Sequence, residues 1–268
     1  MLIVLWTLVL ISLLVSTIAA SGSGRTRQAA DLKRNAQLRA EADGGVEEAV
    51  FHLLDGSKAH WPADGAVHVI KRGDTVLTMR IDTEAGKVNP NRASQDLLAG
   101  LFQALGLDSR TALATATRMI VWRFAGAQGA AEHGDGRDYL PPGAPFESIP
   151  EVGLVAGITP SLLARLAPHL SLYRDNDPEP ASADPVVQQA MAIAAGTGDT
   201  ARQNAIAGSN QQGNNRDESV VSVISEAKDA TGRRFVRRAI VLVGSDPQTR
   251  GKPDQRPFQI MTWDAPAA

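Results

Sequence analysis

Apolar side chains run almost uninterrupted through the start of this 268-residue chain. The segment from Met1 to Ala20 has no charged residue, and its polar members are serines and threonines. At about 1.5 Å per residue, a helix of that length spans roughly 30 Å, the thickness of a bilayer's hydrocarbon core. Beyond a short Ser21–Gly24 stretch, apolar residues continue at helical spacing to about Leu54. The pattern predicts a hydrophobic helix that runs into an amphipathic stalk helix.

Runs rich in β-branched residues predict strands on both sides of a long central segment. Asp55-Gly56-Ser57 ends the stalk helix, and a turn near Gly73 joins the first two strands into a hairpin. The predicted strands cover residues 66–70, 75–81, 219–227, 235–243 and 257–263.

The central segment has helical character from Ala93 to about Tyr173. Asn91–Ser94 offers an N-cap for its first helix. A polar stretch rich in Gly, Asn and Gln, residues 196–218, predicts a mobile loop. The remaining predicted helices cover residues 111–122, 146–155, 160–170 and 185–195.

This order of elements predicts an α+β fold, in which one antiparallel sheet packs against the long N-terminal helix. The central helices form a large α-helical insertion between its strands. The expected domains are a hydrophobic membrane and assembly helix (1–24), the stalk helix with the first strands (25–91), the helical insertion (92–195), the flexible loop (196–218) and the C-terminal strands (219–268).

Composition narrows the classes of function. The formal net charge is −2 and cysteine is absent, so the chain has no disulfide framework and no thiolate nucleophile. A helix-hairpin-helix interpretation of residues 149–170 would need clustered bases to hold nucleic-acid phosphates. The segment between Pro141 and Asp175 has no lysine, and its only arginines are Arg165 and Arg174. We therefore expect a packing hairpin and no nucleic-acid partner.

Candidate chemistry is sparse. The five histidines have no metal-ligand spacing, and we interpret His68 as a cross-strand partner within a strand. Carboxylates in and near the loop around residues 126–145 could hold calcium, but they lack EF-hand-like spacing, so a solvated loop is the favoured interpretation. We expect no catalytic residue and no certain cofactor. The calcium candidates are Glu132, Asp135, Asp138 and Glu147.

The N-terminal run alone leaves three interpretations open: a cleaved secretory signal, a single-pass anchor, and a pilin-type N-terminus that serves as anchor and assembly core. No basic residue precedes the run, as a signal peptide would require. For a single-pass anchor, the basic flank would place the large domain in the cytoplasm. That flank consists of Arg25, Arg27, Lys33 and Arg34.

Several segments taken together resemble the minor pseudopilin K family of bacterial type II secretion systems. The likeness rests on residues 84–94 (EAGKVNPNRAS), 121–123 (VWR), 144–152 (APFESIPEV), 157–160 (GITP) and 163–173 (LARLAPHLSLY). The residues that carry the motifs are Glu84, Gly86, Asn89, Asn91, Trp122, Pro145, Phe146 and Gly157.

The resemblance implies a pilin-like fold and a non-enzymatic subunit at the tip of a periplasmic pseudopilus, acting in assembly initiation and in protein secretion across the outer membrane. It favours the pilin-type N-terminus: a single pass of the inner membrane, with the soluble domain in the periplasm. The implied partners are the minor pseudopilins I and J, other pseudopilins and the inner-membrane secretion platform. The assembly helix would pack through Leu2, Leu5, Trp6, Leu8 and Leu10.

Three features bear on this assignment. The chain has no acidic residue before Asp31, and K members likewise lack the glutamate near position five that other pilin-like subunits keep. A subunit with no neighbour above it needs no such carboxylate, and the resemblance to the K family implies this terminal position in the fibre. K members are cut after a glycine, but no glycine precedes the apolar run here. K members can also bind calcium in the helical domain, and Phe124-Ala125-Gly126 here replaces the acidic cluster that often follows the Trp-Arg pair. The rival interpretations are a membrane-tethered periplasmic enzyme and a DNA-uptake-type minor pilin.

Overall fold

The computed structural model describes residues 1–124, 141–196, 219–244 and 257–265, with the side chains of residues 17–26 left out. The chain divides into two compact units. The first contains helix α1 and most of a five-stranded sheet, and the second contains the shorter helices. These elements confirm the predicted α+β class.

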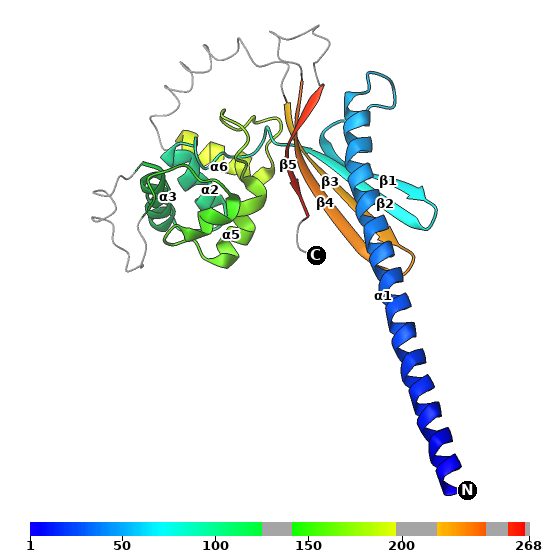
Figure 1. The fold of residues 1–268 in the computed structure, drawn as a ribbon. Helices are drawn as coiled ribbons and strands as arrows, with labels where there is room; N and C mark the ends of the chain where they lie inside the picture. The colour runs from blue at the N-terminus through cyan, green and yellow to red at the C-terminus, as the bar shows by residue number, and fades with distance from the viewer. Residues whose placement is uncertain (125–140, 197–218, 245–256, 266–268) are drawn as a thin grey trace. The chain divides into compact units, whose positions relative to one another are not determined.

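Helix α1, Leu2–Leu54, continues through the Ser21–Gly24 stretch (Figure 1). It ends at Asp55, whose backbone is extended and whose carboxylate accepts hydrogen bonds from the Ser57 amide (2.9 Å) and hydroxyl (2.7 Å). The predicted stop signal is therefore confirmed. Within the residues searched, no helix has an apolar stretch long enough to cross a membrane.

The sheet has the strand order β1-β2-β3-β4-β5, so neighbours in the sheet are also neighbours in the sequence. The Glu84 amide, just after β2, donates to the Val220 carbonyl at the start of β3. The Gly244 amide after β4 likewise donates to the Pro257 carbonyl before β5. Both contacts fit antiparallel pairing. The strands are β1 (Asp64–Arg72), β2 (Thr75–Thr83), β3 (Ser219–Asp229), β4 (Arg234–Val243) and β5 (Phe258–Asp264).

The second half of α1 packs on the sheet. Leu38 and Ala42 on the helix are buried together with Leu77 and Met79 of β2 and Ala227 of β3. Every second residue of β2 is buried here, as expected for a strand with one covered face. Burial of this stripe explains why the helix holds its position on the sheet, since each fully buried side chain of this size contributes about 2 kcal/mol.

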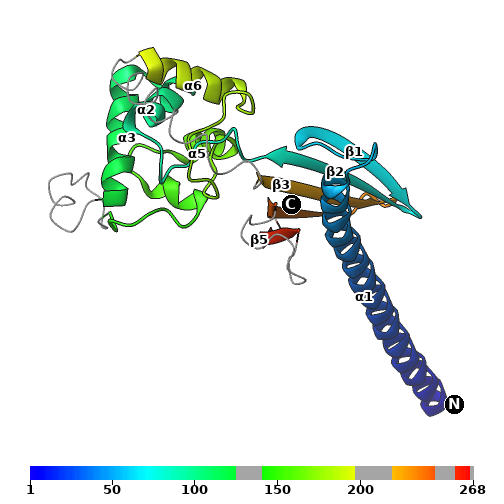
Figure 2. The same cartoon turned by 90° about the horizontal axis from the view of Figure 1, so that it is seen from above.

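The helices of the second unit form a block of their own (Figure 2). Helix α2 packs against both α3 and α6, and Phe102, Leu98 and Met119 are buried in its core. The Ser94 hydroxyl accepts from the Leu97 amide and so provides the predicted N-cap of α2. The elements are α2 (Gln95–Ala104), α3 (Ser109–Phe124), η1 (Ile149–Leu154), α5 (Pro160–Leu166), η2 (Ala167–His169) and α6 (Pro185–Gly196).

One helical prediction is wrong in kind. The sequence pattern predicts a helix over residues 146–155, but the structure has only the short 3-10 helix η1 there. Pro150 stands in its first turn and Gly153 follows, and both residues disfavour a longer α-helix. The predicted mobile loop lies almost wholly outside the described residues.

Candidate functional site

The N-terminal part of α1 presents an apolar surface. The side chains of Leu2, Leu5, Trp6, Leu8 and Leu10 are all more than half exposed, and so are their neighbours up to Val15. Contiguous exposed apolar surface of this extent is typical of protein or membrane contact rather than of a free monomer surface. These residues therefore form a candidate assembly surface.

Glu84 and Gly86 begin the motif segment immediately after β2. The Glu84 side chain is only 2% exposed and pairs with the Lys87 ammonium at 2.5 Å, which compensates the buried charge. Gly86 lies so close to the Ser182 carbonyl that any Cβ would collide with backbone. The two residues thus fix the path of the chain as it leaves the sheet.

Asn89 and Asn91 extend this anchoring with side-chain amides. The Asn89 Oδ1 accepts from the Asn91 backbone amide (2.8 Å), and the Asn89 Nδ2 donates to the Arg174 backbone carbonyl. Asn91 makes a reciprocal pair with Phe146, donating to its carbonyl (2.9 Å) and accepting from its amide (2.7 Å). An amide is the side chain that can donate and accept in this way, which explains asparagine at both positions.

Arg123 follows Trp122 in the VWR segment and binds the motif segment directly. Its guanidinium donates to the Pro90 carbonyl (2.9 Å) and the Ala93 carbonyl (3.1 Å), and the residue is 7% exposed. Burial lowers the pKa of Arg123. The Trp122 ring stacks on Phe146 with centroids 5.8 Å apart. The Trp-Arg pair therefore clamps α3 onto the motif segment.

The last two motif residues have different roles. Gly157 has φ of +90°, a conformation that glycine adopts without strain, and Thr115 and Arg118 lie close to the position of a Cβ. Pro145 is exposed and precedes the buried Phe146. The motif residues together form a structural anchor, and their arrangement contains no nucleophile paired with a base.

The calcium candidates stay largely untested. Glu132, Asp135 and Asp138 lie outside the described residues. Glu147 is exposed, and its backbone amide donates to the Glu151 carboxylate (2.7 Å). In the part of the chain that the structure describes, no three His, Cys, Asp or Glu residues converge as a metal site.

Three histidines take part in two arrangements that no local sequence pattern indicates. Trp61 stacks between His52, with ring centroids 4.1 Å apart, and His68, with centroids 3.9 Å apart. His68 thus contacts an aromatic ring. His169 pairs with Asp184 at 2.7 Å, and the same carboxylate caps the start of α6. Neither arrangement includes a hydrogen-bonded nucleophile.

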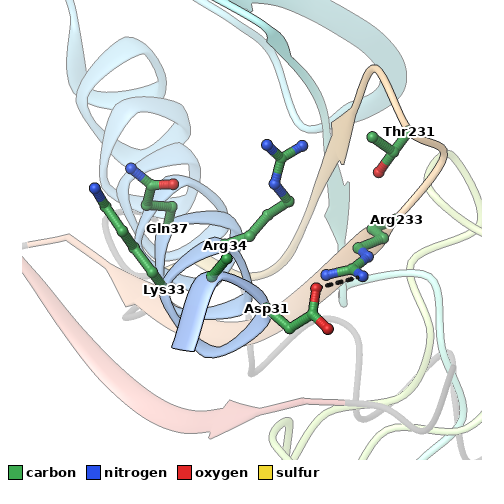
Figure 3. Close-up of a pocket in the computed structure, with 7 residues that line it drawn as sticks. Asp31, Lys33, Arg34, Gln37, Thr231 and Arg233 are labelled. Carbon is green, nitrogen blue, oxygen red and sulfur yellow. Dashed lines mark hydrogen bonds and ion pairs between the residues drawn. The ribbon is translucent and has the colours of Figure 1, made fainter. Parts of the chain in front are cut away.

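A charged wedge lies where α1 passes the turn between β3 and β4, within the first unit (Figure 3). It has a volume of about 680 Å³. Asp31 pairs with Arg233 across the gap at 2.7 Å, and Arg34 pairs with Asp229 at 3.3 Å. The wedge is lined by Ala30, Asp31, Lys33, Arg34, Gln37, Thr231 and Arg233.

Comparison with known proteins finds one matching family and a similar solved structure. Residues 77–175 match the family of the type II secretion system (T2SS), protein K. No curated protein matches the chain. A chain from the crystal structure of the GspK-GspI-GspJ complex of the enterotoxigenic Escherichia coli type 2 secretion system is similar in fold, with a TM-score of 0.58 and 14% identity over 91% of this chain and 100% of that chain. The family match confirms the predicted resemblance, and the structural likeness confirms the fold.

Proposed function

We propose, on the premise that residues 77–175 belong to the protein K family of the type II secretion system, that this chain is a minor pseudopilin at the tip of a pseudopilus. The single observation that carries the proposal is that this matched segment contains the anchored motif from Glu84 to Phe146. In this role the protein initiates pseudopilus assembly and acts in protein secretion across the outer membrane.

The first part of α1 is proposed to be both membrane segment and assembly core. The exposed apolar side chains from Leu2 to Leu10 support this, because none of the residues that the structure describes covers them. In the proposed arrangement the helix passes once through the bacterial inner membrane and the folded units lie in the periplasm. After assembly, the same side chains pack against other pseudopilin helices by van der Waals contact.

The proposed partners are the minor pseudopilins I and J. The similar solved structure is a complex of GspK with GspI and GspJ, which makes the equivalent subunits of this chain's own system the first candidates. Other pseudopilins and the inner-membrane platform would join later in assembly. The proposed role is non-enzymatic, since a subunit of this kind needs contact surfaces rather than a reacting centre.

The test is co-purification of the full chain in detergent with full-length I and J subunits, followed by size-exclusion chromatography with light scattering. We expect a 1:1:1 complex. The Trp6→Glu variant should fail to form this complex, because a carboxylate in an apolar helix contact is unpaired and costly. Leu113→Glu, which alters an exposed apolar residue of α3, is the matched control and should assemble normally. Separate monomers for the wild-type chain would contradict the proposal.

A further inference from the structure

We propose that the flank of α1 formed by Lys33 and Gln37, which borders the charged wedge beside the β3–β4 turn, is a docking site for a carboxylate of a partner's stalk helix. The inference rests on the proposed function, because it takes the partner to be a neighbouring pseudopilin. It goes further by naming the site on this chain and the chemistry that the partner must supply.

The first argument is the charge balance of the wedge. Asp31 holds Arg233, and Asp229 holds Arg34, so two cations already have carboxylate partners. The Thr231 hydroxyl and backbone amides lower the pKa of Asp229, so this carboxylate is ionised at neutral pH and can hold Arg34. Lys33 is the remaining cation, and within the described part of the chain it has no carboxylate partner. One positive charge is therefore left over.

The second argument is the position of Lys33. Figure 3 shows Lys33 and Gln37 side by side on one flank of α1, as their spacing of four residues requires, while Asp31 reaches toward Arg233. All three helix residues are exposed. An incoming carboxylate on that flank would meet an ammonium and an amide donor together, which is a set suited to an acidic side chain.

The third argument excludes a lipid headgroup as the preferred occupant. Lys33 follows the end of the apolar run at Ala20 by a helical distance of about 20 Å. The headgroup layer on each side of a bilayer is only about 5 to 8 Å thick. Arg25 and Arg27 fall near that layer, and Lys33 lies beyond it. Packed helices, in contrast, have axes about 8 to 10 Å apart, so an Asp or Glu on a neighbouring stalk comes within reach of Lys33.

The experiment measures the affinity of full-length chain for the I–J pair in detergent at low salt. Lys33→Glu should weaken binding by about fivefold, the upper end expected when an exposed ion pair is disturbed. The difference in affinity between Lys33→Glu and the wild type should nearly vanish near 1 M salt, where the screening length is about 3 Å. Lys58→Glu, which alters an exposed lysine after α1, is the matched control and should bind as the wild type does.

A zero-length carbodiimide cross-link identifies the occupant. We expect an amide between Lys33 and an Asp or Glu of the I or J stalk helix, located by mass spectrometry. If the wild-type chain fails to bind I and J, the proposed function fails. If it binds but Lys33→Glu and Lys58→Glu have equal affinity, or if the effect of Lys33→Glu appears only with anionic lipid present, the Lys33 flank is not the docking site.

Discussion

At the scale of single residues, Asp229 organises the turn between β3 and β4. Its Oδ1 accepts from the Thr231 hydroxyl (2.6 Å) and from the Thr231 and Arg233 amides, while its Oδ2 pairs with Arg34. These donors, the Thr231 hydroxyl foremost, lower the pKa of Asp229 from the ordinary 3.8. A carboxylate held in this way favours the folded state only while it is ionised.

Asp229→Asn should therefore destabilise the chain in a pH-dependent manner. With the pKa of the folded state below that of the unfolded state, the stabilisation is complete above about pH 4 and is lost as the pH falls through the lowered value. The difference in unfolding free energy between wild type and variant should be largest near pH 6 and should narrow toward pH 3. Urea unfolding across that range measures it. Asp74→Asn, at an exposed carboxylate of the β1–β2 turn, is the control, and equal pH profiles for both variants would contradict the assignment.

Arg123 provides a second prediction at this scale. Arg123→Met should lower the free energy of unfolding by about 2 to 4 kcal/mol, because it removes two hydrogen bonds from a charged donor and leaves the Pro90 and Ala93 carbonyls without them. Arg110→Met, at an exposed arginine of the same helix, should change stability by less than about 0.5 kcal/mol. Equal effects of the two substitutions in chemical unfolding would show that the buried clamp contributes nothing.

At the scale of elements, the contact between α1 and the sheet depends on the side chain that is missing at Gly45. A Cβ there would collide with the Ser225 hydroxyl and lie 3.3 Å from the Ser225 Cβ, whereas a Cβ at Gly44 would meet only Arg72 Nη1 at 3.8 Å. The two adjacent glycines thus differ in whether the helix can accept alanine. Helix α1 approaches β3 closely at Gly45 and has room for a side chain at Gly44.

Gly45→Ala should cost about 1 to 2 kcal/mol, since the overpacking exceeds the gain in helix propensity. Gly44→Ala should stabilise the chain by about 0.5 to 1 kcal/mol through that gain alone. Adding Ser225→Ala to Gly45→Ala should restore part of the loss, and this coupling is the measurement that separates collision from a general intolerance of alanine in α1. Additive effects in the double-mutant cycle would rule the collision out.

At the scale of the whole molecule, periodicity predicted the elements but not their side-chain partners. The strands and the Ser94 cap appear within a few residues of their predicted places, because alternation and capping are local signals. The pairing of Arg123 with the Pro90 carbonyl joins positions far apart in the chain, and no local pattern encodes it. The wedge was missed for the same reason, since Asp31 and Arg233 are 202 residues apart. The helix prediction for residues 146–155 failed because Pro150 limits the helix there to a short 3-10 turn, whereas apolar spacing alone would extend it.

The division of α1 into an exposed half and a packed half yields the last prediction. Because the side chains of residues 2–16 are all exposed with respect to the described part of the chain, deletion of residues 2–24 should leave the thermal midpoint within about 2 °C of the full chain while abolishing membrane retention. Deletion of residues 2–38 should lower the midpoint by roughly 8 °C or more, since it also removes the buried Leu38 and the partners of Arg233 and Asp229. Calorimetry and membrane fractionation measure the two effects. A large loss of stability in the shorter deletion would mean that the apolar half supports the fold, and its exposed side chains would then not be reserved for assembly.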